Sequence, residues 1–120
     1  MSKQAHDSAH LHVSGRSEYV DDRPVLPNEV FVEPVWSRQA HGLIKEINCK
    51  EALLIPGVRG VFTGKDFVCN QWGTIFQDQP LLADGKVQFA GEPVALIAAD
   101  SREIARKAAR SVKISIEVLD

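Results

Sequence analysis

The sequence has 120 residues, of which 44% are hydrophobic and 25% charged, and its formal net charge is −2. This is the usual size and composition of one soluble globular domain, and the near-neutral charge gives no electrostatic reason to expect nucleic acid or an anionic membrane as partner. No apolar run approaches the roughly 20 residues that span a bilayer, and the polar beginning lacks the apolar centre of a signal peptide, so a cytoplasmic protein is expected.

The beginning of the chain is predicted to be an irregular arm. Gly15, Pro24 and Pro27 interrupt any periodic pattern, and HVSGRSEYVDD is predicted to hold a short strand or two around a glycine turn. Asp21 and Asp22 precede a proline-rich turn, and we interpret them as turn residues rather than as a catalytic carboxylate pair. An arm of this kind needs a surface to lie on.

Three strands and a short helix are predicted next. The strands are VFVEPVWS (30–37), HGLIKEIN (41–48) and VRGVFT (58–63). Pro34 cannot donate a ladder hydrogen bond, so the first strand is expected at a sheet edge or with a bulge. The stretch CKEALLIPG (49–57) is predicted to be helical, with Asn48 capping its start, and the following GKDF adds a helical turn.

Residues 68–86 are the longest stretch without a periodic pattern. Glycines and prolines are spread through it, yet it also carries the apolar side chains of Trp72, Ile75, Phe76, Leu81 and Leu82. Apolar side chains in a long loop usually mean that the loop packs against a surface. We therefore expect this loop to pack against a surface.

The end of the chain is predicted to contain three strands and a helix. VQFAG (87–91) is a short strand, and PVALIAA (93–99) is apolar throughout, as in a strand that is covered on both faces. Asp100 and Glu103 fit a capping box for the helix that follows, and KISIEVL (113–119) alternates as a strand. The apolar face of the helix carries Ile104, Ala105, Ala108, Ala109 and Val112.

The other face of this helix carries a stripe of cations. Arg102, Arg106 and Arg110 follow one another at spacings of four residues, where like charges repel by about 0.2–0.5 kcal/mol. A neighbouring acidic surface would compensate, and a solvated helix face is the simpler interpretation. Together the elements predict an α+β fold of five or six strands with two helices, in which residues 1–29 form the arm and residues 30–120 the domain.

The residues alone reveal no recognisable active site. His6, Asp7, His10 and His12 are metal-ligating types, and their spacing would place His10 and His12 on one face of a strand, so a small metal-binding protein is one hypothesis. No helix or loop frame holds this group in place, and we favour solvated or locally hydrogen-bonded histidines.

The remaining reactive side chains are isolated in the sequence. His41 has no serine, cysteine or carboxylate partner in a nucleophile arrangement, so we interpret it as structural. Cys49 and Cys69 lack a CxxC spacing and are expected to be plain thiols. The glycines of PGVRGVFTG match neither a P-loop nor a GxGxxG pattern.

Four stretches occur in an order that is typical of a known family. They are HDSAHLHVSGRSEYVDD (6–22), SRQAHGLIKEINCKEALLIPGVRGVFTGKDF (37–67), PLLADGKVQFAGEPVALIAAD (80–100) and the Arg-Lys-Ala-Ala helix that ends in VKISIEVL. In this order they resemble the molybdenum-cofactor-binding chain of xanthine dehydrogenases and aldehyde oxidases. The first stretch is most similar to the xanthine dehydrogenase branch.

The resemblance implies that the chain is the N-terminal α/β-hammerhead domain of the molybdenum subunit, which is not catalytic in the family. It also implies that the chain continues past the Glu-x-Leu motif at Glu117-Val118-Leu119, because the catalytic and cofactor-binding residues of the family lie downstream. We therefore assign no catalytic, cofactor-binding or metal-binding residue in these 120 residues.

For the complete enzyme the resemblance implies hydroxylation of purines, related heterocycles or aldehydes. Molybdopterin cofactor, iron-sulfur clusters and FAD would serve that reaction. The partners of this chain would be the remaining molybdenum-binding domains and the iron-sulfur and FAD domains or subunits, with no nucleic acid and no membrane.

The stretch QWGTIFQD (71–78) resembles a family segment whose apolar residue lines the substrate funnel. Ile75 or Phe76 would then border the channel of the complete enzyme, and simple packing of the loop on its own domain is the alternative.

A second hypothesis for the whole chain is a free-standing binding or interaction module without catalytic activity. Its length and apolar content permit this. The two hypotheses differ in whether the coding sequence continues in frame past Asp120.

Overall fold

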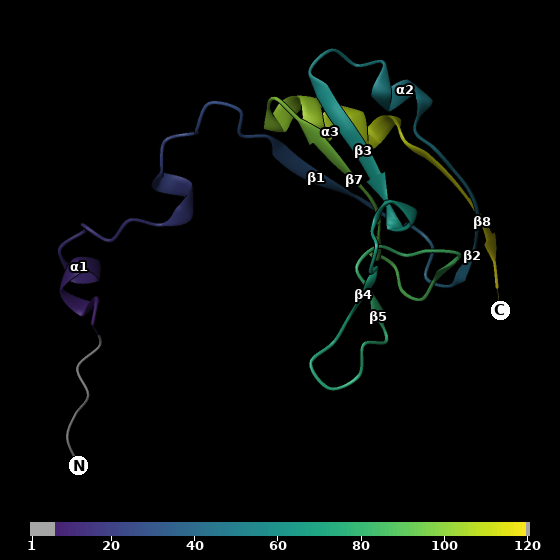
Figure 1. Ribbon diagram of the computed structural model, residues 1–120, viewed down its shortest axis with the longest axis horizontal. Coiled ribbons are helices and arrows are strands. Elements are labelled where there is room, and N and C mark those ends of the chain that lie inside the picture. Colours follow the sequence, from purple (N-terminus) through teal and green to yellow (C-terminus); the bar gives the residue numbers. More distant parts are fainter. Residues whose placement is uncertain (1–6, 120) are drawn as a thin grey trace.

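The structure, a computed structural model, describes residues 7–119. Its radius of gyration is 19.0 Å, against about 14 Å for a compact domain of this length. Figure 1 shows the reason, because the N-terminal arm and a long hairpin both project from a body of strands and helices. None of residues 7–30 is buried, whereas the core begins within the first strand at Val35.

The arm contains helical turns, so the short strands expected around Gly15 are wrong. A helix, α1 (Ala9–Val13), precedes this glycine, and a 3₁₀ turn, η1 (Val20–Asp22), follows. Gly15 has a φ of +68°, and the Arg16 amide donates back to the Leu11 carbonyl at 2.9 Å, which ends the helix. Strands need a neighbour to pair with, and the described arm has no sheet partner, so its backbone bonds locally instead.

Sheet A carries most of the core. Its strand order is β1 (Phe31–Trp36), β7 (Pro93–Ala99), β3 (Val58–Thr63), and both pairings are antiparallel. The apolar β7 lies in the centre and five of its seven residues are buried, as its composition predicts. Pro34 lies on the edge strand β1, so the edge position, one of the two alternatives for this proline, is confirmed. The register shifts just beyond it, between Val35 and Trp36.

Sheet B is built around β2 (Gly42–Asn48), which pairs with β8 (Lys113–Val118) on one side and with β6 (Lys86–Val87) on the other. A Cβ on Gly42 would lie 2.6 Å from the Glu117 carbonyl oxygen, so β2 and β8 approach each other where only glycine fits. The short strand expected at 87–91 ends at Val87 instead. There the buried Glu92 carboxylate accepts a hydrogen bond from the Gln88 amide at 2.6 Å and holds a turn.

The stretch 68–86 contains a hairpin that its sequence does not reveal. Two-residue strands, β4 (Gln71–Trp72) and β5 (Gln79–Pro80), pair with each other and are too short to show a periodic pattern. The Asn70 side chain closes the base of the hairpin, donating to the Leu82 carbonyl at 2.7 Å and accepting from the Leu82 amide at 3.0 Å.

The helices begin and end close to the expected positions, with two corrections. The helix α2 (Lys50–Leu53) is shorter than the predicted 49–57, and the Asn48 side chain accepts from the Lys50 amide while Cys49 is the cap residue. The helix α3 (Arg102–Ser111) is capped by Ser101, whose Oγ accepts from the Ile104 amide at 3.2 Å. The capping box expected at Asp100 is therefore wrong. The turn expected in GKDF is confirmed as η2 (Gly64–Asp66).

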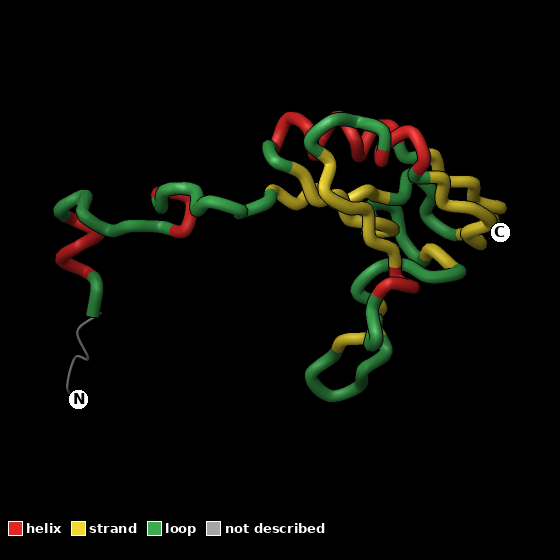
Figure 2. Tube along the Cα trace, turned by 45° about the horizontal axis from the view of Figure 1, so that its top comes forward, coloured by secondary structure: helices red, strands yellow, loops and turns green. Residues whose placement is uncertain are grey.

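The core consists of two clusters that share one residue. The first lies between sheet A and the helices α2 and α3, and the second lies between sheet B, Ala83 and the start of β7. Ile114 on β8 packs against both clusters and so connects the sheets. Figure 2 shows α2 and α3 together on one side of the strands. The α+β class is confirmed, with five strands of six or seven residues, three of two residues and three α-helices within residues 7–119, against the two helices predicted.

Candidate functional site

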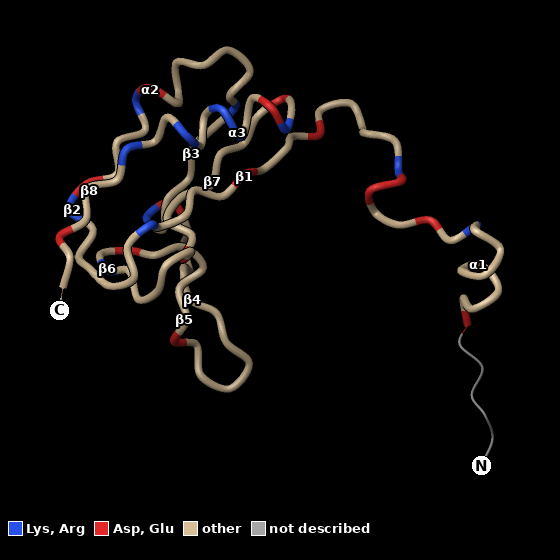
Figure 3. The backbone as a smooth tube through the Cα atoms, turned by 180° about the vertical axis from the view of Figure 1, so that it is seen from behind, with Lys and Arg blue, Asp and Glu red and all other residues tan. Residues whose placement is uncertain are grey.

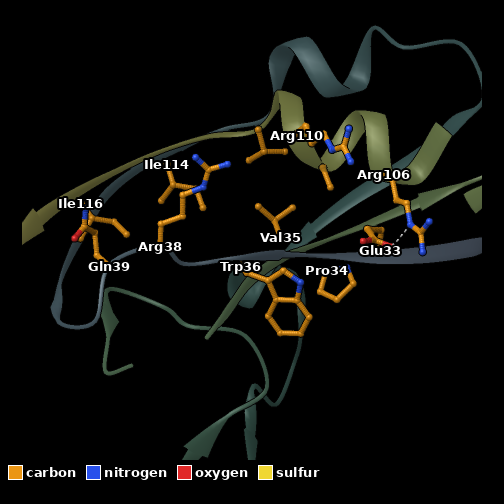
Figure 4. A pocket seen from close by; sticks show the side chains of 12 residues that line it. Glu33, Pro34, Val35, Trp36, Arg38, Gln39, Arg106, Arg110, Ile114 and Ile116 are labelled. Carbon is orange, nitrogen blue, oxygen red and sulfur yellow. Dashed lines mark ion pairs between the residues drawn. The ribbon is translucent and has the colours of Figure 1, made fainter. Parts of the chain in front are cut away.

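A groove lies on the body between β1, α3 and β8 and has a volume of about 700 Å³. Figure 4 shows Val35 at its centre and the side chains of Arg38, Arg106 and Arg110 around it. The arginine stripe on α3 has two different surroundings: Arg102 faces the arm, whereas Arg106 and Arg110 line the groove. Arg102 reaches Asp21 of the arm at 3.3 Å, Arg106 reaches Glu33 at 3.7 Å, and Arg110 makes no ion pair with the described residues.

The two residues proposed for a substrate channel lie in the loop at the end of the β4–β5 hairpin. The side chains of Ile75 and Phe76 are strongly exposed, at 85% and 76%. Gly73 allows the loop to fold back, since a Cβ there would lie 1.7 Å from the Phe76 carbonyl oxygen. The loop thus presents two large apolar side chains to the surroundings at the end of a projecting hairpin (Figure 1).

The histidines do not share a strand face. His10 and His12 lie on the helix α1, where positions two apart point in different directions, so the expected strand geometry is wrong. His12 bonds through its ring to the Tyr19 hydroxyl at 3.1 Å, and His6 lies outside the described residues. His41 is half-buried just before β2, and its carbonyl accepts from the Leu119 amide. Within residues 7–119 no three His, Cys, Asp or Glu side chains come together as metal ligands.

The cysteines have the properties of plain thiols. Both are free, Cys49 being half-buried and Cys69 exposed. Burial, with a smaller contribution from the charge of Asp66, raises the pKa of the Cys49 thiol. A raised pKa disfavours the thiolate that a nucleophile or a metal ligand needs. Burial therefore makes the Cys49 thiol a poor nucleophile or metal ligand.

The carboxylates of Asp66 and Asp22 accept hydrogen bonds from backbone amides in short turns. Asp66 accepts from the Thr63 amide at 2.7 Å and from its hydroxyl at 2.9 Å, and these bonds lower the pKa of Asp66. Asp22 closes the η1 turn by accepting from the Tyr19 amide, as the turn interpretation predicts. Neither carboxylate faces the groove.

No helix in the described part of the chain combines the length and apolar character needed to cross a membrane.

The groove is the feature that sequence reasoning missed. The arginine stripe on α3 is visible as a spacing of four residues, but Arg38 comes from the connection between β1 and β2, far away in the sequence. Only the fold brings these side chains around one apolar surface.

The described residues form an α+β domain. Two antiparallel sheets share its core, helices cover it, and an arm and a hairpin extend from it. The model of one family, described as the a/b hammerhead domain of aldehyde oxidase and xanthine dehydrogenase, matches residues 14–120. The chain belongs to this family, and the predicted resemblance is confirmed.

Solved structures and curated relatives agree with this assignment. The chain is similar to a CO dehydrogenase from Oligotropha carboxidovorans, with a TM-score of 0.85 and 34% identity over 98% of this chain and 15% of that one. It is 37% identical to a xanthine dehydrogenase of Calliphora vicina and 38% identical to aldehyde oxidase 1 of Rattus norvegicus, over 93% and 91% of this chain. It spans 8% of the length of each of these two relatives, and the identities do not separate the two branches.

Proposed function

We propose that this chain is a non-catalytic structural module of a molybdenum hydroxylase, which docks on the cofactor-binding part of that enzyme and helps to shape its substrate entrance. One observation carries the proposal. The chain matches along nearly its whole length, but it corresponds to only 15% of a solved enzyme chain and 8% of curated relatives. A segment that repeats a small, separate part of such enzymes is best explained as that part.

The complete enzyme, in this proposal, acts in the cytoplasm and hydroxylates a purine, a related heterocycle or an aldehyde. It carries molybdopterin cofactor, iron-sulfur clusters and FAD, which supply the redox chemistry. Residues 7–119 offer no group of metal ligands, and the charged side chains of the groove are three arginines and one glutamate. Within the described residues there is thus no ligand set for a metal or an iron-sulfur cluster. In this proposal the remaining domains or subunits hold the cofactors.

The arm and the domain have separate tasks in this proposal. Residues 1–29 form the arm and residues 30–120 the hammerhead body. Exposed apolar side chains on the arm support this division, and they include Tyr19, Val20, Val25 and Leu26, each at least 60% exposed. Clustered apolar groups without cover are typical of an interaction surface. The remaining molybdenum-binding domains of the same enzyme are the partner that we propose for them.

The hairpin loop would contribute to the substrate entrance. Ile75 and Phe76 project from the body and are not buried by their own domain, which leaves them available to line a channel formed with other domains. Their apolar character suits a funnel for planar heterocycles, because such substrates are bound mainly by apolar contact.

The first test is the size of the native polypeptide in its source cells, measured by immunoblot with an antibody against this domain. A band several times larger than 13.2 kDa is expected. A single band at 13.2 kDa would instead favour the free-standing interaction module and end the present proposal. The exposed apolar arm and loop fit both alternatives, so size is the property that separates them.

A further inference from the structure

The groove on the body is an open part of the hydrophobic core. Its floor is made by Val35 of β1, by Ala109 and Val112 at the end of α3, and by Ile114 and Ile116 of β8. Val35 is buried and the other four are half-buried, and four of the five residues, all but Ile116, belong to or pack against the main core cluster. Here β1 and β8 are both edge strands, so no further strand of residues 7–119 covers the space. The groove therefore leaves apolar core surface without cover.

The charges around this floor are strongly unequal. Arg38, Arg106 and Arg110 line the groove together with one carboxylate, Glu33, which Arg106 already approaches at 3.7 Å. Arg38 and Arg110 make no ion pair with the described residues. Figure 3 shows basic residues along α3. The arm, in contrast, is acidic, with five acidic and two basic residues among those described. The groove thus has two unpaired guanidinium groups beside an apolar surface.

This arrangement fits a polypeptide segment better than a small anion. The guanidinium groups stand apart along the groove rather than converging on one point (Figure 4), and the Arg106 side chain is 61% exposed. A small-anion site would hold buried, converging donors. Pro34 removes a backbone donor from the β1 edge, which weakens recognition by strand addition there. Recognition must then come largely from side chains, with apolar groups on the floor and carboxylates on the arginines.

We propose that the groove binds an extended segment from the remainder of the same enzyme, with at least two Asp or Glu among apolar residues. This rests on the proposed function, because the chain corresponds to only 15% of a solved enzyme chain and the rest can supply the segment. Arg38 and Arg110 bind the two carboxylates, and the apolar side chains cover Val35, Ile114 and Ile116.

The test is photo-cross-linking in the intact enzyme. The amino acid p-benzoylphenylalanine is placed at Arg110, at Arg38, or at Lys107, which is exposed on the same helix but does not line the groove. Mass spectrometry of the cross-linked peptides is expected to give one segment of the same polypeptide from both groove positions, with two or more acidic residues, and not from Lys107. No cross-link from the groove would overturn the proposal. So would a segment without acidic residues, another subunit, or a second copy of this chain.

A charge-reversal experiment gives an independent readout. In the intact enzyme, Arg38→Glu together with Arg110→Glu should speed amide hydrogen exchange in β8 and in the cross-linked segment by about tenfold or more. Arg38→Lys with Arg110→Lys should keep most of the protection, and Lys107→Glu is the matched control. Both arginines are exposed, so the reversal does not disturb the core. Equal exchange in all three variants would contradict the proposal even where cross-links form.

The two proposals fail in different ways. If the native polypeptide is only 13.2 kDa, the proposed function and this inference fall together. If the polypeptide is larger and the groove gives no acidic segment, the proposed function stands and the groove assignment alone is wrong.

Discussion

At the scale of single residues, the loop of the β4–β5 hairpin gives the clearest separation of function from stability. Ile75 and Phe76 contribute little to the core because they are 85% and 76% exposed. Removing such side chains usually changes the free energy of unfolding by no more than about 0.5 kcal/mol. A change in kinetics without a change in stability then indicates that these side chains border the substrate channel.

We therefore expect Ile75→Ala and Phe76→Ala in the complete enzyme to raise the KM for substrate clearly while leaving the Tm nearly unchanged. Steady-state kinetics and thermal unfolding measure the two effects. The control is Leu54→Ala, which removes a side chain that is 82% exposed but lies after α2. A lower Tm with unchanged kinetics would remove the channel assignment.

Asp66 links stability to pH at the same scale. Hydrogen bonds from Thr63 lower the pKa of Asp66 in the folded state, so the charged form is favoured by folding. This stabilisation is present above the pKa of an unfolded aspartate, about 3.9, and is lost as the pH falls through the lower folded-state pKa. Asp66→Asn should lower the Tm at neutral pH and reduce the decrease of the Tm as the pH falls below about 4, where the stabilisation by the charged Asp66 is lost. Parallel Tm curves for both proteins would contradict this.

At the scale of elements, the start of α3 shows which of two neighbouring residues holds the helix. Ser101→Ala removes the cap of the Ile104 amide and should cost about 0.5–2 kcal/mol of unfolding free energy. Asp100→Ala removes an exposed ion pair with Arg59 and should cost less. Denaturant titration of both variants measures the difference. A larger loss of unfolding free energy for Asp100→Ala than for Ser101→Ala would contradict the assignment of Ser101 as the cap residue.

This pair also shows what the sequence could and could not predict. Asp100 and Ser101 are both good cap residues, and local pattern alone cannot choose between them. Arg59, 41 residues away, takes the Asp100 carboxylate, and only the antiparallel pairing of β3 with β7 brings it there. By contrast, the apolar run of β7 predicts its own burial, because that signal is contained in the strand itself.

In the candidate site, too, features within one segment can be predicted from the sequence, whereas contacts between distant segments cannot. The arginine spacing on α3 is a local signal and was visible, whereas the groove also needs β1 and β8, which the fold places beside α3. The glycine and prolines of the arm predict an irregular segment, but the strands expected in it do not form, because strand propensity is not realised without a pairing partner.

At the scale of the whole molecule, the arm is the part whose stability depends on what surrounds it. Its described residues form local turns and one ion pair with the body, between Asp21 and Arg102, and bury no side chain. Segments with so few buried contacts open at little free-energy cost and are the first to be cut by proteases. The superposition on a solved enzyme nevertheless covers 98% of this chain. Much of the arm is therefore included in the part that superposes.

If the rest of the enzyme covers the arm, proteolysis should depend on its presence. Trypsin should cut the Arg16–Ser17 bond, and a glutamate-specific protease the Glu18–Tyr19 bond, about tenfold or more faster in the 120-residue chain than in the complete enzyme. The bond after Lys107, within α3, is the internal control and should resist in both, because the helix packs on the core through Ala105 and Ala108. Equal cutting of the arm in the two proteins would mean that the arm does not dock on the remaining domains. Rapid cutting after Lys107 in the short chain alone would show instead that the body needs the rest of the enzyme in order to fold.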